Sequence, residues 1–384
     1  MSRHILITGA TGALGKGVMP ALLASMPDAR FTVLTRRPGQ QPAVSRVAEL
    51  RCDLTDSRWL RSLPDDLAHS VTGILHMAAD VRWNATVEDA LKMNTSVCAA
   101  LADWAQSRCD RLEVFCYVST AYVEAPSHLK CSPGFIQHED RLYNNSYEYS
   151  KNLGEREVLA RKLPSVIVRP SLILGDSRTG EIGSFNGLYT LLRFASQGLV
   201  PVVAGAGQAY VDTVSLDTVV DAILLALKRA PEPAGRIIWA ISGEDAPRVE
   251  DLMNACVTGL NQFRTTRGAS PIEPPAVVRY ETYRRLYRPW FEQQASSVQK
   301  QMLEYIDVFT PYFSMTDVFR PEASHDVLTS PNWRTALPKI VGYWCETNQR
   351  AALKPLRPWK SSSISTQQPV KGIADDRFSA VPTD

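Results

Sequence analysis

The sequence has no strong excess of either charge and no long apolar run. Its 42 basic and 40 acidic residues leave a formal net charge of +2, which gives no reason to expect nucleic acid or an anionic membrane as the main partner. No uninterrupted stretch of about 18 or more apolar residues occurs. The opening MSRHILITGATG also lacks the apolar region of a signal peptide. We therefore expect no integral membrane span and no nucleic-acid partner.

Cysteine and histidine are few and scattered. The seven cysteines form no CxxC pair, and the six histidines show no ligand-like spacing. Disulfide frameworks and zinc sites both need closer, paired spacing. The pattern predicts reduced thiols, a cytoplasmic location and no metal site.

The composition that remains is that of an ordinary globular protein. A hydrophobic content of 45% and a charged content of 21% allow a sizeable core. A length of 384 residues fits two average domains, or one large α/β domain with an appendage.

The first half of the chain alternates short β-rich runs with helical patterns, which is typical of a parallel sheet with helices on both faces. The expected strands are His4–Thr8, Phe31–Thr35, Ala48–Cys52, Gly73–Met77, Glu113–Val118 and Ser165–Val168. The expected helices are Ala13–Ser25, Val87–Gln106, Tyr147–Lys162 and Ser215–Leu227. The fold class predicted from this alternation is α/β, a doubly wound Rossmann sheet.

The pattern changes near residue 244, where the alternation stops and prolines cluster. We predict a dinucleotide-binding core over residues 1–243 and a smaller, mostly helical substrate-binding region over 244–354. Residues 355–384 are polar and lack periodicity. Such a segment cannot bury enough apolar area to offset ordering, at ~1–2 kcal/mol per residue, so we expect a disordered tail.

A glycine-rich segment follows the first expected strand and opens the first expected helix. Residues 8–15 read TGATGALG, with glycines at 9, 12 and 15. Gly9 allows a sharp turn, Gly12 allows close approach of a phosphate, and Gly15 allows close packing of helix on sheet. The helix N-terminus then faces the pyrophosphate of a dinucleotide. The predicted contacts are Gly9, Thr11, Gly12, Ala13, Leu14 and Gly15.

The second expected strand ends in two arginines. NAD-binding proteins usually place an acidic residue there for the ribose 2′-hydroxyl, whereas an arginine accommodates the 2′-phosphate of NADP. Arg36 and Arg37 stand at this position and no acidic residue does. The sequence therefore favours NADPH. In the alternative interpretation, Arg36 and Arg37 are solvated charges of a loop and do not bind the cofactor.

Three residues are candidates for the catalytic groups. Tyr147 and Lys151 are four apart, and so lie on one face of a helix. A nearby cation favours the phenolate form of a tyrosine. Thr120 follows a buried strand at the carboxyl edge of the sheet, where ligands of open α/β sheets bind.

This ordered set resembles the extended short-chain dehydrogenase/reductase superfamily, from residue 4 to roughly 225. The resemblance implies that Thr120 orients a carbonyl oxygen, Tyr147 donates a proton, and Lys151 lowers the tyrosine pKa and binds the nicotinamide ribose. Ser119 is the rival for the hydroxyl role. Further cofactor contacts implied by the matching motifs are Asp53, Leu54, Ala78, Ala79, Asn94 and Pro170.

Within the superfamily, HMAADVRW (76–83), YVSTAYV (117–123) and VRPSLILGDSRTGE (168–181) look most like the fatty acyl-CoA reductase and thioester reductase branch. The resemblance implies hydride transfer from NADPH to an acyl thioester, carried by coenzyme A or a carrier protein. The alternatives are a carbonyl reductase or sugar-nucleotide epimerase, and a non-catalytic NADP sensor. Two- or four-electron reduction, the acyl group and a homodimer are left open.

A basic aromatic stretch, Arg279–Phe291, interleaves arginines with Tyr280, Tyr283, Tyr287 and Trp290. Three interpretations remain open. The stretch is a substrate lid that grips phosphates, an interfacial helix that meets lipids, or an amphipathic helix packed on the core with its arginines solvated.

Overall fold

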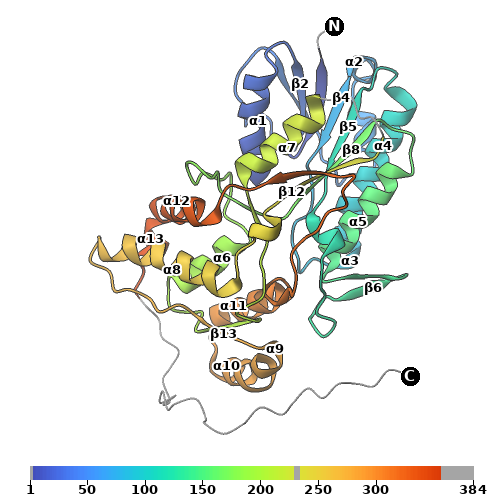
Figure 1. The fold of residues 1–384 in the computed structure, drawn as a ribbon. Helices are drawn as coiled ribbons and strands as arrows, with labels where there is room; N and C mark the ends of the chain where they lie inside the picture. The colour runs from blue at the N-terminus through green and yellow to red at the C-terminus, as the bar shows by residue number, and fades with distance from the viewer. Residues whose placement is uncertain (1–2, 229–233, 356–384) are drawn as a thin grey trace, which may run out of the picture.

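The structure, a computed structural model, describes residues 3–228 and 234–355. The predicted tail lies outside the described residues apart from Pro355. Figure 1 shows a sheet flanked by helices, with a helical region beyond the end of the sheet opposite to the N-terminus. Among the helices that the structure describes, none combines the length and hydropathy that a bilayer crossing requires.

The main sheet has eight strands in the order β14-β12-β8-β5-β4-β1-β2-β3, and every neighbouring pair is parallel. From β1 the order of the strands proceeds outward on both sides, through β2 and β3 on one side and through β4, β5, β8, β12 and β14 on the other. This is the doubly wound Rossmann arrangement, and it confirms the predicted fold class. The strands are β1 (His4–Thr8), β2 (Arg30–Thr35), β3 (Val47–Arg51), β4 (Gly73–His76), β5 (Val114–Val118), β8 (Ser165–Pro170), β12 (Arg236–Ile241) and β14 (Asp326–Thr329).

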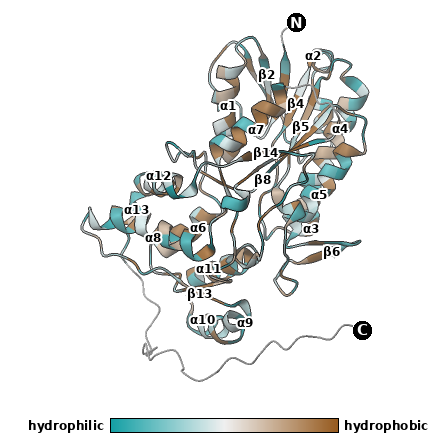
Figure 2. Ribbon diagram, viewed as in Figure 1, coloured by the Kyte–Doolittle hydropathy of each residue, from teal (hydrophilic) through white to brown (hydrophobic). Residues whose placement is uncertain are grey.

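The apolar strands form because both faces of the sheet are covered. Successive side chains of a strand point to opposite faces. In β1, Ile5 and Ile7 pack on one face of the sheet and Leu6 on the other, all with no exposed surface. In Figure 2 the central strands are mostly hydrophobic.

Two helix pairs cover the faces. On one side α1 (Ala13–Ser25) and α7 (Leu216–Lys228) pack together, and on the other α4 (Val97–Arg108) packs with α5 (Ser146–Leu159). The helix expected over 87–106 is divided into α3 (Val87–Ala90), a π-helical turn at Leu91–Ser96, and α4. Such turns add one residue and often mark functional sites.

Beyond the sheet, a second hydrophobic core is shared by α6 (Leu188–Ala195), α8 (Val249–Thr265), α11 (Ser297–Phe309) and α12 (Trp333–Thr347). Both sequence regions contribute to both parts of the fold. α6, which precedes residue 243, lies in the second core, and β14, which follows residue 243, lies in the main sheet. The boundary at residue 243 stays a prediction. We use "C-terminal region" below for residues 244–355.

The remaining elements are short. They are α2 (Leu67–Ser70), the antiparallel pair β6 (Ile136–His138) and β7 (Arg141–Tyr143), the parallel pairs β9 (Leu172–Leu174) with β11 (Thr213–Ser215) and β10 (Val202–Ala204) with β13 (Ala276–Val278), α9 (Tyr280–Thr282), α10 (Arg288–Gln294) and α13 (Gln349–Ala352). Short 3-10 turns lie at Trp59–Ser62, Ala121–Glu124, Gly243–Asp245 and Tyr312–Ser314.

Candidate active site

The glycine loop joins β1 to α1 at the carboxyl edge of the sheet. Gly9 has a φ of +79°, and a Cβ there would lie 2.6 Å from the backbone nitrogen of Ala78. A Cβ on Gly15 would lie 2.4 Å from the carbonyl oxygen of Gly9. Both positions therefore exclude a side chain. Gly9 makes the predicted sharp turn, whereas the atoms nearest to a Cβ on Gly15 belong to the backbone of the loop and not to the sheet.

The N-terminus of α1 is open to an anion. Gly12 is exposed and caps the helix without a side chain, and the first turn contains no acidic residue. The free N–H groups and positive dipole end of such a turn suit a phosphate. The flanking predicted residues Thr11, Ala13 and Leu14 are all half-buried. This cradle fits the pyrophosphate of a dinucleotide.

The ends of β2 and β3 carry the charged candidates. Arg36 and Arg37 are exposed just beyond β2. The exposed Asp53 follows β3, and its Oδ1 accepts hydrogen bonds from Thr55 N at 3.0 Å and Thr55 Oγ1 at 2.8 Å. These bonds, together with the charge of Arg36, lower the pKa of Asp53. Arg36 and Asp53 therefore lie at the same edge of the sheet. Leu54, which follows Asp53, is half-buried.

The loop after β4 is fixed to both neighbouring elements. Ala78 N donates to Thr8 Oγ1 at 3.2 Å. Asn94, fully buried on the π-helical turn, accepts from Asp80 N at 2.7 Å and donates to Ser150 Oγ at 2.9 Å. The amide of Asn94 therefore ties the Ala78–Asp80 loop to α5, which is a positioning arrangement. Direct contact of Ala78, Ala79 or Asn94 with a cofactor stays a prediction.

The structure brings Thr120 and Tyr147 together. Thr120 is buried two residues beyond the end of β5, and its hydroxyl lies close enough to the phenol of Tyr147 to lower the pKa of that tyrosine. Its Oγ1 also donates to Pro170 O at 3.4 Å. Ser119, the rival, has a buried hydroxyl without a partner among the described residues. Because Thr120 and not Ser119 acts on the phenol of Tyr147, the structure favours Thr120 for the hydroxyl role.

Lys151 lies one turn along α5 and is almost fully buried. Its ammonium donates to Val118 O at 2.6 Å and stands 4.0 Å from the ring centre of Tyr117. Burial lowers the pKa of Lys151 to about 8. Burial and the Glu148 carboxylate raise the pKa of Tyr147, so the phenol is protonated at neutral pH. A lowering of that pKa by Lys151 stays a prediction.

His76, at the end of β4, lies beside this lysine. Its Nδ1 is 2.7 Å from Thr8 Oγ1, and its ring stacks on Tyr117 with centroids 5.6 Å apart. Burial and the charge of Lys151 lower the histidine pKa to about 3. His76 is therefore neutral at physiological pH.

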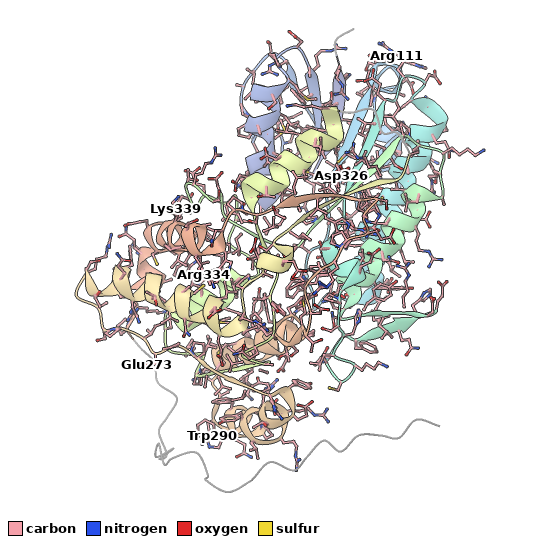
Figure 3. All side chains as sticks on the ribbon, viewed as in Figure 1. Arg111, Glu273, Trp290, Asp326, Arg334 and Lys339 are labelled. Atoms are coloured by element: carbon pink, nitrogen blue, oxygen red, sulfur yellow. The ribbon has the colours of Figure 1, made fainter. Side chains whose placement is uncertain are left out.

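The loop from Asp176 to Gly187 contacts the first turn of α1 through Gly183. A Cβ on Gly183 would lie 2.7 Å from Ala13 O, and Lys16 Nζ donates to Gly183 O at 3.1 Å. At the other end of the loop Lys339 of α12 donates to Ser177 O at 3.4 Å. Figure 3 labels Lys339, at the border between the C-terminal region and the core. The loop thus joins α1 of the Rossmann core to α12 of the C-terminal region.

Glu148 and Tyr312 were not singled out by any sequence motif. Glu148 follows Tyr147 directly and has no exposed surface, and Tyr312 of the C-terminal region donates to it at 2.6 Å. One sequence signal for Glu148 existed, because an acidic residue is rarely buried and Glu148 directly follows the candidate tyrosine, Tyr147. No local signal could have found Tyr312.

The basic aromatic stretch forms α9, a π-helical turn (Tyr283–Tyr287) and α10 at the outer end of the molecule, where Figure 3 labels Trp290. Tyr283 and Phe291 are buried, whereas Arg284 and Arg285 are exposed. The stretch is thus amphipathic, as one interpretation predicted, but it packs on the second core and not on the Rossmann core. Arg288 departs from the expected solvated arginines, because it is mostly buried and pairs with Asp307 at 3.0 Å.

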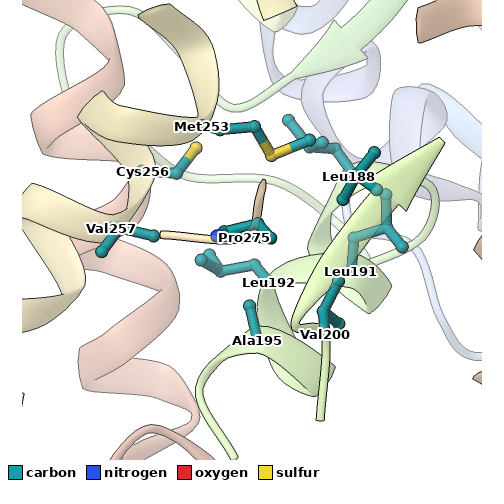
Figure 4. Close-up of a pocket in the computed structure, with 10 residues that line it drawn as sticks. Leu188, Leu191, Leu192, Ala195, Val200, Met253, Cys256, Val257 and Pro275 are labelled. Carbon is teal, nitrogen blue, oxygen red and sulfur yellow. The ribbon is translucent and has the colours of Figure 1, made fainter. Parts of the chain in front are cut away.

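An apolar cavity lies between α6 and α8 (Figure 4). Leu188, Leu192, Met253 and Val257 are among its lining residues, and none of the predicted site residues is. At about 20 Å³ it has room for little more than one water molecule. The cavity is separate from the site described above.

Part of the chain is similar in sequence to known proteins. Residues 60–223 match a family model described as male sterility protein, an NAD-binding domain. Fatty acyl-CoA reductase 1 of Xenopus laevis is 29% identical over 321 residues, which are 68% of this chain and 59% of the relative. The chain thus spans about three fifths of the length of this curated relative.

Solved structures resemble the whole described fold. The terminal R domain from the myxalamid PKS-NRPS biosynthetic pathway has a TM-score of 0.67 at 20% identity, with 93% of both chains covered. The enzyme WbmG of Bordetella bronchiseptica, in complex with NAD and UDP, has a TM-score of 0.60 at 16% identity, covering 90% of this chain and 96% of WbmG. At these identities the likeness concerns the fold. By the family match over residues 60–223, the reductase relatives and this shared fold, the chain resembles the extended short-chain dehydrogenase/reductase superfamily and is most like its male-sterility-type branch of fatty acyl-CoA and thioester reductases.

Proposed function

We propose that the protein is an NADPH-dependent reductase that transfers hydride to an acyl thioester. The observation that carries the proposal is that the Thr120 hydroxyl, just beyond the carboxyl end of β5, lies close enough to Tyr147 to lower the pKa of its phenol, with Lys151 one turn further along α5. The thioester is proposed from the relatives, which are fatty acyl-CoA reductases. A protonated phenol beside a hydroxyl is the arrangement that a carbonyl oxygen needs to gain a proton.

The residues present fit a nicotinamide dinucleotide. The glycine cradle and open N-terminus of α1 would take the pyrophosphate. Arg36 and Arg37 would take a 2′-phosphate, because both are exposed and cationic. Lys151 would bind the nicotinamide ribose. When bound, the cofactor supplies the hydride.

The chain's own residues would do the rest. Thr120 and Tyr147 donate hydrogen bonds to the substrate carbonyl oxygen, and Tyr147 gives it a proton as the carbon is reduced. The lysine ammonium stabilises the phenolate that results. The hemithioacetal then loses its thiol to give an aldehyde, and a second round would give an alcohol.

The test is Tyr147→Phe, followed by NADPH absorbance at 340 nm with a panel of acyl-CoAs, aldehydes and UDP-sugars. Loss of a general acid costs about 10²–10⁴ in rate, and we expect at least that loss in kcat. The dissociation constant for NADPH should stay unchanged. Retained turnover would contradict the role of Tyr147.

Tyr149→Phe is the matched control, because Tyr149 is a buried tyrosine on the same helix that contacts His138 and Tyr143 instead. The panel separates the candidates. NADPH oxidation with acyl-CoA supports the proposal, oxidation with aldehydes alone favours a carbonyl reductase, and sugar epimerisation without net oxidation favours an epimerase. NADPH binding without any turnover favours a cofactor sensor.

A further inference from the structure

A buried carboxyl group lies next to the proposed proton donor. Glu148 follows Tyr147 on α5 and has no exposed surface. Its Oε2 accepts from Asn144 N at 2.7 Å, and its Oε1 accepts from Asn144 Nδ2 at 3.3 Å. Its third donor is Tyr312, whose hydroxyl lies 2.6 Å from Oε1. Three converging donors favour the ionised carboxylate, which only accepts.

The third donor comes from the C-terminal region, across the border with the Rossmann core. Tyr312 is 1% exposed, and its hydroxyl also accepts from Asn145 Nδ2 at 2.7 Å. Its ring stacks on Trp83, with centroids 4.1 Å apart, and meets Tyr122 edge-on at 4.7 Å. The position of Tyr312 is therefore fixed by core residues on several sides. A shift of the C-terminal region would break the contact with Glu148.

The charge of Glu148 acts on the tyrosines around it. The titratable groups within reach of its charge are Tyr147, its neighbour on α5, Tyr312, which hydrogen-bonds it from the C-terminal region, and Tyr122 from the turn after β5. Its negative charge raises the pKa of each. Burial, opposed by the bonds from Tyr312 and Asn144, raises the pKa of Glu148 itself to about 7. The group therefore changes charge near neutral pH.

We propose that Glu148 is a positioning residue that, through its hydrogen bond to Tyr312, makes the acidity of Tyr147 depend on pH and on the seating of the C-terminal region. The inference rests on the proposed function, because it concerns the same proton transfer. An ionised Glu148 opposes formation of the Tyr147 phenolate, and a protonated Glu148 does not. Reduction is therefore faster below the point at which Glu148 ionises.

The first measurement needs no turnover. Infrared difference spectra of the full chain, titrated from pH 5 to pH 9 (about two units on either side of neutrality, the interval around the ionisation of the group), report the carboxyl C=O band. We expect one buried carboxyl band to disappear near pH 7 and to be missing in Glu148→Gln. A Glu148→Gln spectrum that retains the band would overturn the inference.

The second measurement is the pH profile of kcat with NADPH and an acyl-CoA, and in parallel with an aldehyde. We expect activity to fall above pH 7 in the unaltered chain. In Glu148→Gln the fall should move up by about one pH unit, to the value near 8 of Lys151. Tyr312→Phe removes a hydrogen bond that lowers the pKa of Glu148. In this variant the fall in kcat should therefore occur at a higher pH but should still be present. Tyr312→Phe should have no further effect on the profile in the Glu148→Gln chain.

The outcomes are distinguishable. Identical profiles for the unaltered and Glu148→Gln chains would overturn the coupling, even if kcat dropped uniformly. Glu157→Gln, which alters a partly exposed carboxylate on the same helix, should leave the profile in place. Aldehyde turnover without acyl-CoA turnover would contradict the proposed thioester substrate alone. Absence of both would contradict the proposed function and the coupling together.

Discussion

At the scale of single residues, burial acts in opposite directions on the two titratable groups of the candidate site. Removing a charge from water disfavours the charged form of any group. Burial therefore raises the pKa of the Tyr147 phenol and lowers that of the Lys151 ammonium to about 8. The tyrosine has a proton to give at neutral pH, and the lysine still carries most of its charge. Both conditions suit reduction rather than oxidation of a substrate.

Cofactor choice is also decided by single residues. We expect Arg36→Ala to raise KM for NADPH about tenfold, or about 1.4 kcal/mol, because an exposed guanidinium bonds a 2′-phosphate with modest strength. KM for NADH should not change, since NADH has no 2′-phosphate. The measurement is initial-rate kinetics with both cofactors. Equal effects on the two cofactors would contradict the assignment of Arg36.

Sequence patterns located the residues that are close to one another in the chain. Tyr147 and Lys151 are four residues apart, and the glycines of the loop lie within seven residues. The contact of Glu148 with Tyr312 joins residues 164 positions apart. No periodicity or spacing records such a contact, because it depends on where the C-terminal region packs. That part of the site needed the structure.

At the scale of the elements, the first half of the chain was predictable because its strands are buried on both faces. The expected strand His4–Thr8 has the bounds of β1, and the other predicted strands differ from the observed ones by one or two residues at their ends. β12 was missed although its run RIIWAI is apolar. β14 gave no signal, because it has four residues and lies half-buried at the sheet edge.

Two helical glycines offer a matched pair. Gly15 in α1 has no room for a Cβ, whereas Gly342 in α12 has nothing within 4 Å of one. We expect Gly15→Ala to lower the free energy of unfolding by about 1–3 kcal/mol, because backbone atoms must move. Gly342→Ala should raise it by about 0.5–1 kcal/mol, since alanine favours the helix.

Urea denaturation followed by far-UV circular dichroism measures both changes. An equal loss of stability in the two variants would indicate that steric room at the glycine loop is not the cause. Dinucleotide affinity should fall only in Gly15→Ala, because Gly342 lies outside the candidate site.

At the scale of the whole molecule, the Rossmann core and the C-terminal region are interleaved. Trp239 of β12 packs against Phe319 and hydrogen-bonds His325, both from the C-terminal region. Asp326, labelled in Figure 3, opens β14 and pairs with Arg236 of β12. Neither part can separate without exposing buried aromatic surface.

We therefore expect the two parts to unfold in one cooperative transition. Tryptophan fluorescence and far-UV circular dichroism should give coincident urea curves, because fully buried tryptophans lie in both cores, at Trp239 and Trp344. Two resolved transitions would contradict this expectation. So would a fragment of residues 1–243 that unfolds cooperatively by itself.

The position of β14 has a consequence for synthesis on the ribosome. β12 ends at Ile241, and its neighbour β14 begins only at Asp326. During translation β12 is complete dozens of residues before β14 is made. Until then the N–H and C=O groups along the open edge of β12 are unpaired and available to other chains. Misassembly during expression should therefore begin at this edge, and a chaperone that binds extended segments would act there first.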